Sequence, residues 1–144
     1  MRARDALGRP VPEGSPEAVE PVPGQALPPE QALELAQQLL DEGRAFFAHE
    51  VLEAVWKAHG RDPYWQGLAQ LCVGITHLQR GNVDGAVTLL RRGAEHLDGR
   101  LRTWGRAEAD RLESGELTLP ELRLRDCASR RPSPGSPGSL APWP

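Results

Sequence analysis

Apolar residues in the middle of the chain recur every three or four positions, which is the period of an amphipathic helix. The first such stretch covers about residues 29–42, begins with prolines and is followed by Gly43. The second, residues 44–60, starts almost directly afterwards and ends at Gly60. Because so short a connection forces the second helix back along the first, we expect the two to form an antiparallel hairpin.

The third stretch, residues 61–81, has the clearest helix start. Asp62 is suited to cap a helix, and Pro63 is suited to its first turn. The stretch is apolar on nearly all sides, which predicts the most buried helix of the fold. Gly67 and Gly74 lie on this helix, and we expect such small residues to let a neighbouring helix come close.

The fourth stretch, residues 82–99, begins at the cap Asn82 and has one apolar stripe with charged residues outside it, so we expect it to cover the buried helix. The stripe consists of Val83, Val87, Leu90, Ala94 and Leu97. A weaker pattern near residues 101–114 contains Leu101, Trp104 and Leu112 and predicts a short helix across one end of the fold.

These patterns predict an all-α fold. We expect residues 28–114 to form a compact antiparallel four-helix bundle of two helical hairpins, plus a short C-terminal helix. Residues 1–27 are rich in proline and poor in large apolar residues, so we expect them to be disordered. Residues 115–144 end in a Pro/Ser/Gly-rich stretch and are expected to form an extended or disordered tail, in which Trp143 is a lone aromatic available to a partner.

Composition excludes several classes of protein. A formal net charge of -3 and a pI near 5.8 argue against a nucleic-acid partner, since nucleic-acid-binding domains are usually basic. No apolar run approaches the roughly 20 residues of a membrane span, and no signal peptide is recognisable at the start. Cys72 and Cys127 lack metal-type spacing. We expect both to be free thiols and the protein to be cytoplasmic.

Candidate chemistry gathers in the stretch FFAHEVLEAVW of the second helix. At about 100° per residue, His49, Glu53 and Trp56 share one strip of that helix. Gln70 and His77 share a polar strip on the buried third helix, where an unpaired polar group costs on the order of 1 to 3 kcal/mol. We therefore expect these five side chains to meet in a polar seam, in which Glu53 accepts a hydrogen bond from Gln70 or His77.

These residues also carry a family resemblance. The pattern His49-x-x-x-Glu53-x-x-Trp56, followed by QLCVGITHLQRGNVDGAVTLLRRG, resembles the small prokaryotic family called domain of unknown function 309. The similarity covers roughly residues 33–98. It implies a compact all-helical bundle of uncharacterised function, whose recurrent features are the histidine, the glutamate and the tryptophan. It implies no reaction.

Three interpretations of the seam compete. In the first it is a structural network, with the Trp56 indole N–H bonded locally. In the second, His49, Glu53 and His77 bind divalent zinc, manganese or iron and support a hydrolase-type activity. In the third, Glu53 is a general acid or base whose pKa is raised by apolar surroundings. Whether the protein is an enzyme stays open at this point.

A fourth interpretation makes the protein an interaction module. Its function would then depend on the covering helices, on the extra helix with Trp104 and on the flexible ends, which would bind a protein partner or a second copy as a homodimer. An exposed apolar patch on the fourth or fifth helix would favour this interpretation. A pocket that opens onto Glu53 and His77 would favour a ligand or metal site instead.

Overall fold

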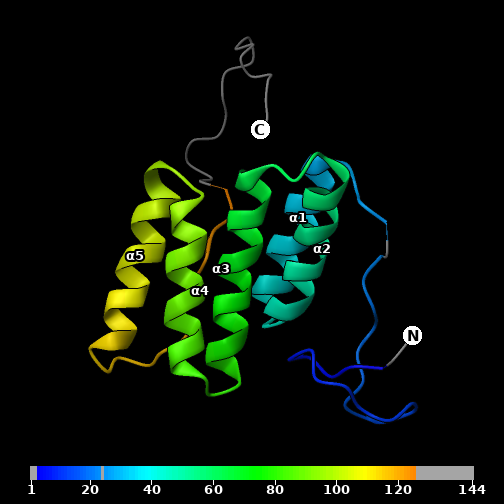
Figure 1. The fold of residues 1–144 in the computed structure, drawn as a ribbon. Helices are drawn as coiled ribbons and strands as arrows, with labels where there is room; N and C mark the ends of the chain where they lie inside the picture. The colour runs from blue at the N-terminus through cyan, green and yellow to red at the C-terminus, as the bar shows by residue number, and fades with distance from the viewer. Residues whose placement is uncertain (1–2, 24, 126–144) are drawn as a thin grey trace.

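The computed structural model describes residues 3–23 and 25–125 (Figure 1). Within this part of the chain there are five helices: α1 Pro29–Asp41, α2 Ala45–Ala58, α3 Pro63–Gln79, α4 Val83–Glu95 and α5 Gly99–Glu113. The expected all-α class is therefore confirmed. The helix that was expected to be short, α5, has 15 residues and is longer than α1.

The helix boundaries follow the signals in the sequence. The Asp62 side chain accepts a hydrogen bond from the backbone N–H of Tyr64 at 2.9 Å and caps α3. The Asn82 side chain accepts one from the N–H of Gly85 at 2.9 Å and caps α4. Gly81, between these helices, has a φ of 85°, a left-handed conformation that glycine adopts without steric cost. Both predicted caps are confirmed.

The central helix is α3, as the sequence predicted. Its side chains Leu68, Leu71 and Cys72 are fully buried. A Cβ atom added to Gly67 would lie 2.9 Å from the carbonyl oxygen of Gly93 on α4, and real Cβ atoms essentially never come that close. The missing side chain therefore allows α3 and α4 to pack backbone against backbone, which confirms the expected close approach.

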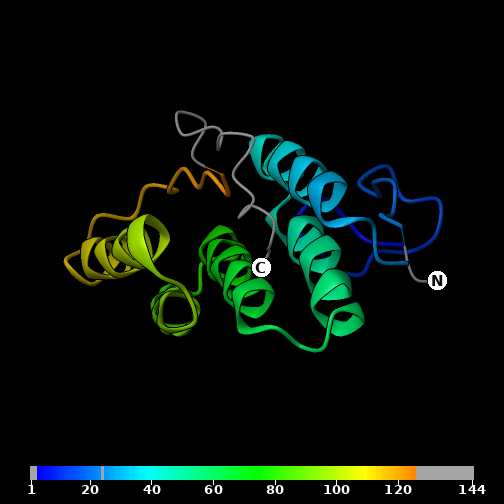
Figure 2. The same ribbon diagram turned by 90° about the horizontal axis from the view of Figure 1, so that it is seen from above.

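The helices form an open arrangement. Extensive contacts join only helices that are neighbours in the chain: α1 with α2, α2 with α3, α3 with α4, and α4 with α5. Seen from above, α2, α3 and α4 form one row, and α1 and α5 lie on the same side of that row with a space between them (Figure 2). The bundle is therefore completed by something other than a direct contact between its first and last helices.

Residues 116–125, which we call the strap, connect α5 with α1 on that side of the row. The strap leaves the end of α5 without helical structure and runs back across the molecule toward α1 (Figures 1 and 2, orange). Leu122 and Leu124 are 3% and 2% exposed and belong to the hydrophobic core. We call the space between α1 and α5 that receives them the strap groove. The strap lies beyond residue 114, where the sequence placed the end of the folded domain.

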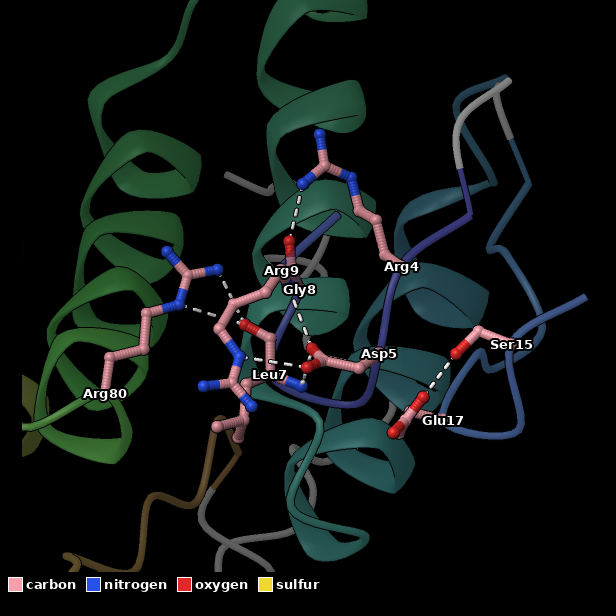
Figure 3. A network of polar contacts seen from close by, with 8 residues as sticks. All are labelled: Arg4, Asp5, Leu7, Gly8, Arg9, Ser15, Glu17 and Arg80. Carbon is pink, nitrogen blue, oxygen red and sulfur yellow. Dashed lines mark hydrogen bonds and ion pairs between the residues drawn. The ribbon is translucent and has the colours of Figure 1, made fainter. Parts of the chain in front are cut away.

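Residues 3–23, for which disorder was expected, have defined contacts in this structure. The carboxylate of Asp5 accepts hydrogen bonds from the backbone N–H groups of Leu7 and Arg9 and from Nε of Arg9 (Figure 3). Burial alone would raise the pKa of the Asp5 carboxyl, but these hydrogen bonds outweigh it and lower that pKa. Arg80, at the end of α3, donates to the carbonyl of Leu7 at 2.7 Å (Figure 3). The segment is thereby tied to the helices.

Candidate functional site

The strip predicted on α2 begins with a contact between His49 and Glu53. Nδ1 of His49 lies 3.2 Å from the carbonyl oxygen of Phe46, one turn earlier. Nε2 of the same ring lies 3.6 Å from Oε1 of Glu53, one turn later. Both ring nitrogens therefore face oxygen atoms of the same helix. The predicted contact between these two side chains is present.

Glu53 lies at the surface, outside the apolar interior. Its side chain is 40% exposed and lines a hollow of about 470 Å³ beside α2. The hollow is also lined by Glu50, Lys57 and residues of the N-terminal segment such as Val22. Glu53 therefore lacks the complete burial in apolar surroundings on which the interpretation as a general acid or base depends. His77 does not line this hollow.

Trp56 and Gln70 each have a buried polar atom without a hydrogen-bond partner among the residues that the structure describes. These atoms are Nε1 of Trp56, a donor, and Oε1 of Gln70, an acceptor. The local bond predicted for the indole N–H is not formed. Instead, the guanidinium of Arg61 lies 4.7 Å from the centre of the Trp56 ring and covers it. A buried group left without a partner costs on the order of 1 to 3 kcal/mol.

His77 lies near the C-terminal end of α3 and contacts Asn82 just beyond it. Its Nδ1 lies 3.1 Å from Nδ2 of Asn82, the residue that caps α4. Nδ2 is an amide donor, so Nδ1 accepts and the imidazole is neutral in this arrangement. Burial lowers the pKa of His77, and the nearby Arg80 lowers it further. The histidine thus ties the end of α3 to the beginning of α4.

The helical rise explains why His77 does not join the pair on α2. His77 lies fourteen residues beyond Pro63, or roughly 21 Å along α3 from the turn that joins the two helices. Glu53 lies five residues before Ala58, or only about 8 Å from the same turn. Among the residues described, no three His, Cys, Asp or Glu side chains are close enough to hold a metal ion. The predicted set of His49, Glu53 and His77 is therefore not assembled.

Of the two cysteines, only Cys72 is among the described residues. Cys72 is a free thiol that is fully buried in α3, and burial raises its pKa well above the usual range. It is therefore protonated and unreactive at neutral pH. Cys127 and Trp143 lie outside the described residues. Within the described part of the chain, no helix has the length and apolar character needed to cross a bilayer.

The sequence analysis missed the residues of the strap groove. Gln37 on α1 contacts the strap backbone twice: Nε2 donates to the carbonyl of Leu122 at 3.1 Å, and Oε1 accepts from the N–H of Leu124 at 2.8 Å. From α5, Nε1 of Trp104 donates to the carbonyl of Glu121 at 3.1 Å. These groups come from both walls of the groove. The strap is therefore held from both sides through its backbone.

Two arginines add contacts to the second half of the strap. Nη2 of Arg100, on α5, donates to the carbonyl of Arg123 at 3.0 Å. Arg125, at the end of the described strap, forms an ion pair with Glu30 in the first turn of α1. One signal in the sequence could have indicated this segment: the leucines of LTLPELRL alternate with other residues, as is typical of an extended chain with one buried side.

Comparison with known proteins gives a family but no described activity. No curated protein and no solved structure matches the chain. The strap and the N-terminal segment lie outside the one matched region. That region, residues 33–89, runs from α1 into α4 and contains all five residues of the predicted seam. It matches the model of the family described as Domain of unknown function (DUF309), which supports the resemblance seen in the sequence.

Proposed function

We propose that this protein is a protein-interaction module whose strap groove holds an extended chain segment. The observation that carries the proposal is how the strap is bound: the helices contact its backbone atoms and bury Leu122 and Leu124. Backbone atoms are common to all sequences, so a groove of this kind accepts other extended segments with suitable apolar side chains. A segment of a partner protein would take the place of the strap.

The contacts of Gln37 support this proposal most directly. Its side-chain amide bonds to the carbonyl of Leu122 and to the N–H of Leu124, two residues further on. A residue in a neighbouring parallel β-strand bonds to its partner strand in the same pattern. Gln37 therefore offers the strap a substitute for a paired strand, which is how many domains bind extended peptides.

The polar seam supports an architectural role beside this groove. His49 contacts Glu53 and the carbonyl of Phe46 within α2, and His77 contacts the cap of α4. These contacts fix the ends and the faces of the helices. Their effect would be to hold α2, α3 and α4 as the rigid base from which α1 and α5 form the groove.

The proposal is tested by offering the strap to the protein as a separate peptide. In the full-length double variant Leu122→Ser/Leu124→Ser, the strap loses its buried anchors while the groove keeps its lining. A fluorescein-labelled peptide of residues 116–125 should bind this variant in an anisotropy titration. It should bind wild-type protein at least tenfold more weakly, because an attached strap competes at an effective concentration in the millimolar range.

Two further variants keep the test decisive. Leu117→Ser/Leu119→Ser changes the exposed leucines of the strap and should behave as wild type. A flexible Gly/Ser insertion between Gly115 and Glu116 keeps both anchors and lowers only the effective concentration of the strap, so it should raise peptide binding even if the double serine variant folds poorly. Equal peptide binding by wild type and by a folded variant with a loosened strap would contradict the proposal.

A further inference from the structure

The strap consists of two similar pentapeptides. Residues 116–120 read ELTLP and residues 121–125 read ELRLR, so each contains two leucines separated by one residue. The structure treats them differently. Leu122 and Leu124 of the second pentapeptide are 3% and 2% exposed, whereas Leu117 and Leu119 of the first are 53% and 55% exposed. One leucine pair is bound, and a closely related pair is left in solvent.

The bound pentapeptide shows which of its features contact the groove. In an extended chain alternate side chains point to the same side, so Leu122 and Leu124 enter the core together. The side chain of Arg123, between them, is 52% exposed and pairs with Glu121 inside the strap. Among the described residues, the helices form a hydrogen bond with the backbone carbonyl of this middle residue and none with its side chain. The groove therefore does not select for the side chain at this position.

The residue after the second leucine meets an acidic rim. Arg125 pairs with Glu30, and Glu34 one turn further along α1 adds to the negative charge around it. The pair is solvent-exposed: the Arg125 side chain is 49% exposed and the Glu30 side chain 76%. Exposed pairs contribute little, typically no more than about 1 kcal/mol, so a cation here strengthens binding without deciding it.

From these contacts we infer that the groove recognises an extended segment of a partner protein with the pattern Leu-x-Leu followed by arginine or lysine. The two leucines fill the apolar positions, Gln37 and Trp104 hold the backbone, and the cation meets Glu30. The middle residue is free to vary. This inference rests on the proposed function of the groove and adds the chemistry of the partner to it.

The exposed pentapeptide is a natural comparison ligand. Pro120 follows its second leucine, so it lacks the cation. In the intact chain Arg111 also holds it beside α5, by donating to the carbonyls of Glu116 and Thr118 at 3.1 and 2.9 Å. It thus differs from the bound pentapeptide in two respects, the missing cation and this tether. Only free peptides compare the two pentapeptides on equal terms.

The experiment uses end-capped peptides and the full-length Leu122→Ser/Leu124→Ser protein, with the linker-insertion variant as a second receptor. ELRLR is compared with ELTLP and with the exchanged forms ELTLR and ELRLE. We expect ELRLR and ELTLR to bind within about twofold of each other, because the groove does not select for the middle side chain. ELTLP and ELRLE should bind about two- to fivefold more weakly at low salt, as expected for an exposed ion pair.

Two controls identify the origin of the preference. Replacing either leucine of ELRLR by serine should weaken binding more than tenfold, because each leucine loses its apolar contact. In a Glu30→Lys receptor the order should reverse, so that ELRLE binds better than ELRLR. High salt should reduce the preference for the cation in the original receptor but leave the dependence on leucine unchanged.

The outcomes separate the two proposals. If neither receptor binds ELRLR, the groove does not accept segments in trans and the proposed function fails. If all four peptides bind equally and lose binding only on leucine substitution, the groove accepts extended segments but the cation preference is overturned. If the middle residue changes affinity more than the leucines do, the inferred pattern is wrong although a peptide site exists.

Discussion

The residues of the predicted polar seam and those of the strap groove form contacts of opposite range. In the seam, His49 contacts residues three and four positions away, and His77 contacts a residue five positions away. In the groove, Gln37 contacts residues 85 and 87 positions away. Local contacts shape individual helices and turns. The distant contacts join the two ends of the helical array, so we expect them to matter more for the stability of the whole fold.

The largest effect is expected from Leu124→Ala. This side chain is 2% exposed, and truncation of a buried leucine typically costs about 2 to 4 kcal/mol through lost burial and the cavity left behind. Leu119→Ala, in the exposed pentapeptide, should change the free energy of unfolding by less than about 0.5 kcal/mol. Urea denaturation followed by circular dichroism measures both. Similar losses in the two variants would mean that the strap is not seated as described.

A smaller loss is expected from Gln37→Ala. The change removes both hydrogen bonds to the strap, each typically contributing about 0.5 to 1.5 kcal/mol. Gln38→Ala is the matched control, because that side chain is exposed and forms its hydrogen bond with Glu42 on its own helix. The difference between the two variants in urea denaturation gives the contribution of the groove contact. Equal stability of the two variants would mean that the distant contacts of Gln37 contribute no more than the local contact of Gln38.

At one residue of the predicted seam, a substitution is expected not to lower the stability of the fold. Gln70→Met removes the buried Oε1 that lacks a partner and replaces the side chain by one of similar length, so it should leave stability unchanged or raise it by up to about 1 kcal/mol. Gln79→Met is the control, since Gln79 has a similar unpaired Oε1 but donates through Nε2 to the carbonyl of Gly43. A clear destabilisation by Gln70→Met would show that Gln70 has a partner in solution.

Glu53→Gln should have little effect on stability, below about 0.5 kcal/mol, because the pair with His49 is long and its carboxylate is 40% exposed. Metal analysis of the same two proteins, purified without chelators, tests the metal interpretation of the seam. We expect equal metal content in wild type and variant. Near-stoichiometric zinc, manganese or iron that disappears in Glu53→Gln would instead make the seam a metal centre.

The smallest effect is the pH dependence contributed by His77. Its folded-state pKa is lowered, by burial first and by Arg80 second, so the unfolded chain binds a proton more readily than the folded one. The stability that depends on neutral His77 is complete above about pH 6.5 and is lost as the pH falls from there through the folded-state value. Thermal melts between pH 7.5 and 5 should show a steeper decline for wild type than for His77→Gln. Parallel declines would contradict this assignment.

The helices could be predicted from the sequence because their signals are local. Asp62 and Asn82 act as caps through bonds to residues two and three positions away, and the period of apolar residues needs no knowledge of the rest of the chain. The same reasoning placed His49 next to Glu53. The close approach at Gly67 was also predictable, because a small residue on a buried helix has few other uses.

The relative positions of residues on different helices were not predictable in the same way. His77 was expected to meet Glu53 because both lie on polar strips, but strips define only a face of a helix and not a height along it. The strap was missed for a different reason. Its polar partners, Gln37 and Trp104, are chemically ordinary, and only the path of the chain brings them to the two leucines.

The sequential contacts of the helices have a consequence for synthesis of the chain. Each helix can pack on the preceding one as soon as it has emerged, since neighbours in the chain are neighbours in space. The side of α1 that carries Gln37 is different, because its partners at Leu122 and Leu124 are translated more than eighty residues later. Throughout that interval this side of α1 lacks the strap, so under the proposed function the ribosome-bound chain would be the first form of the protein in which other extended segments could compete for it.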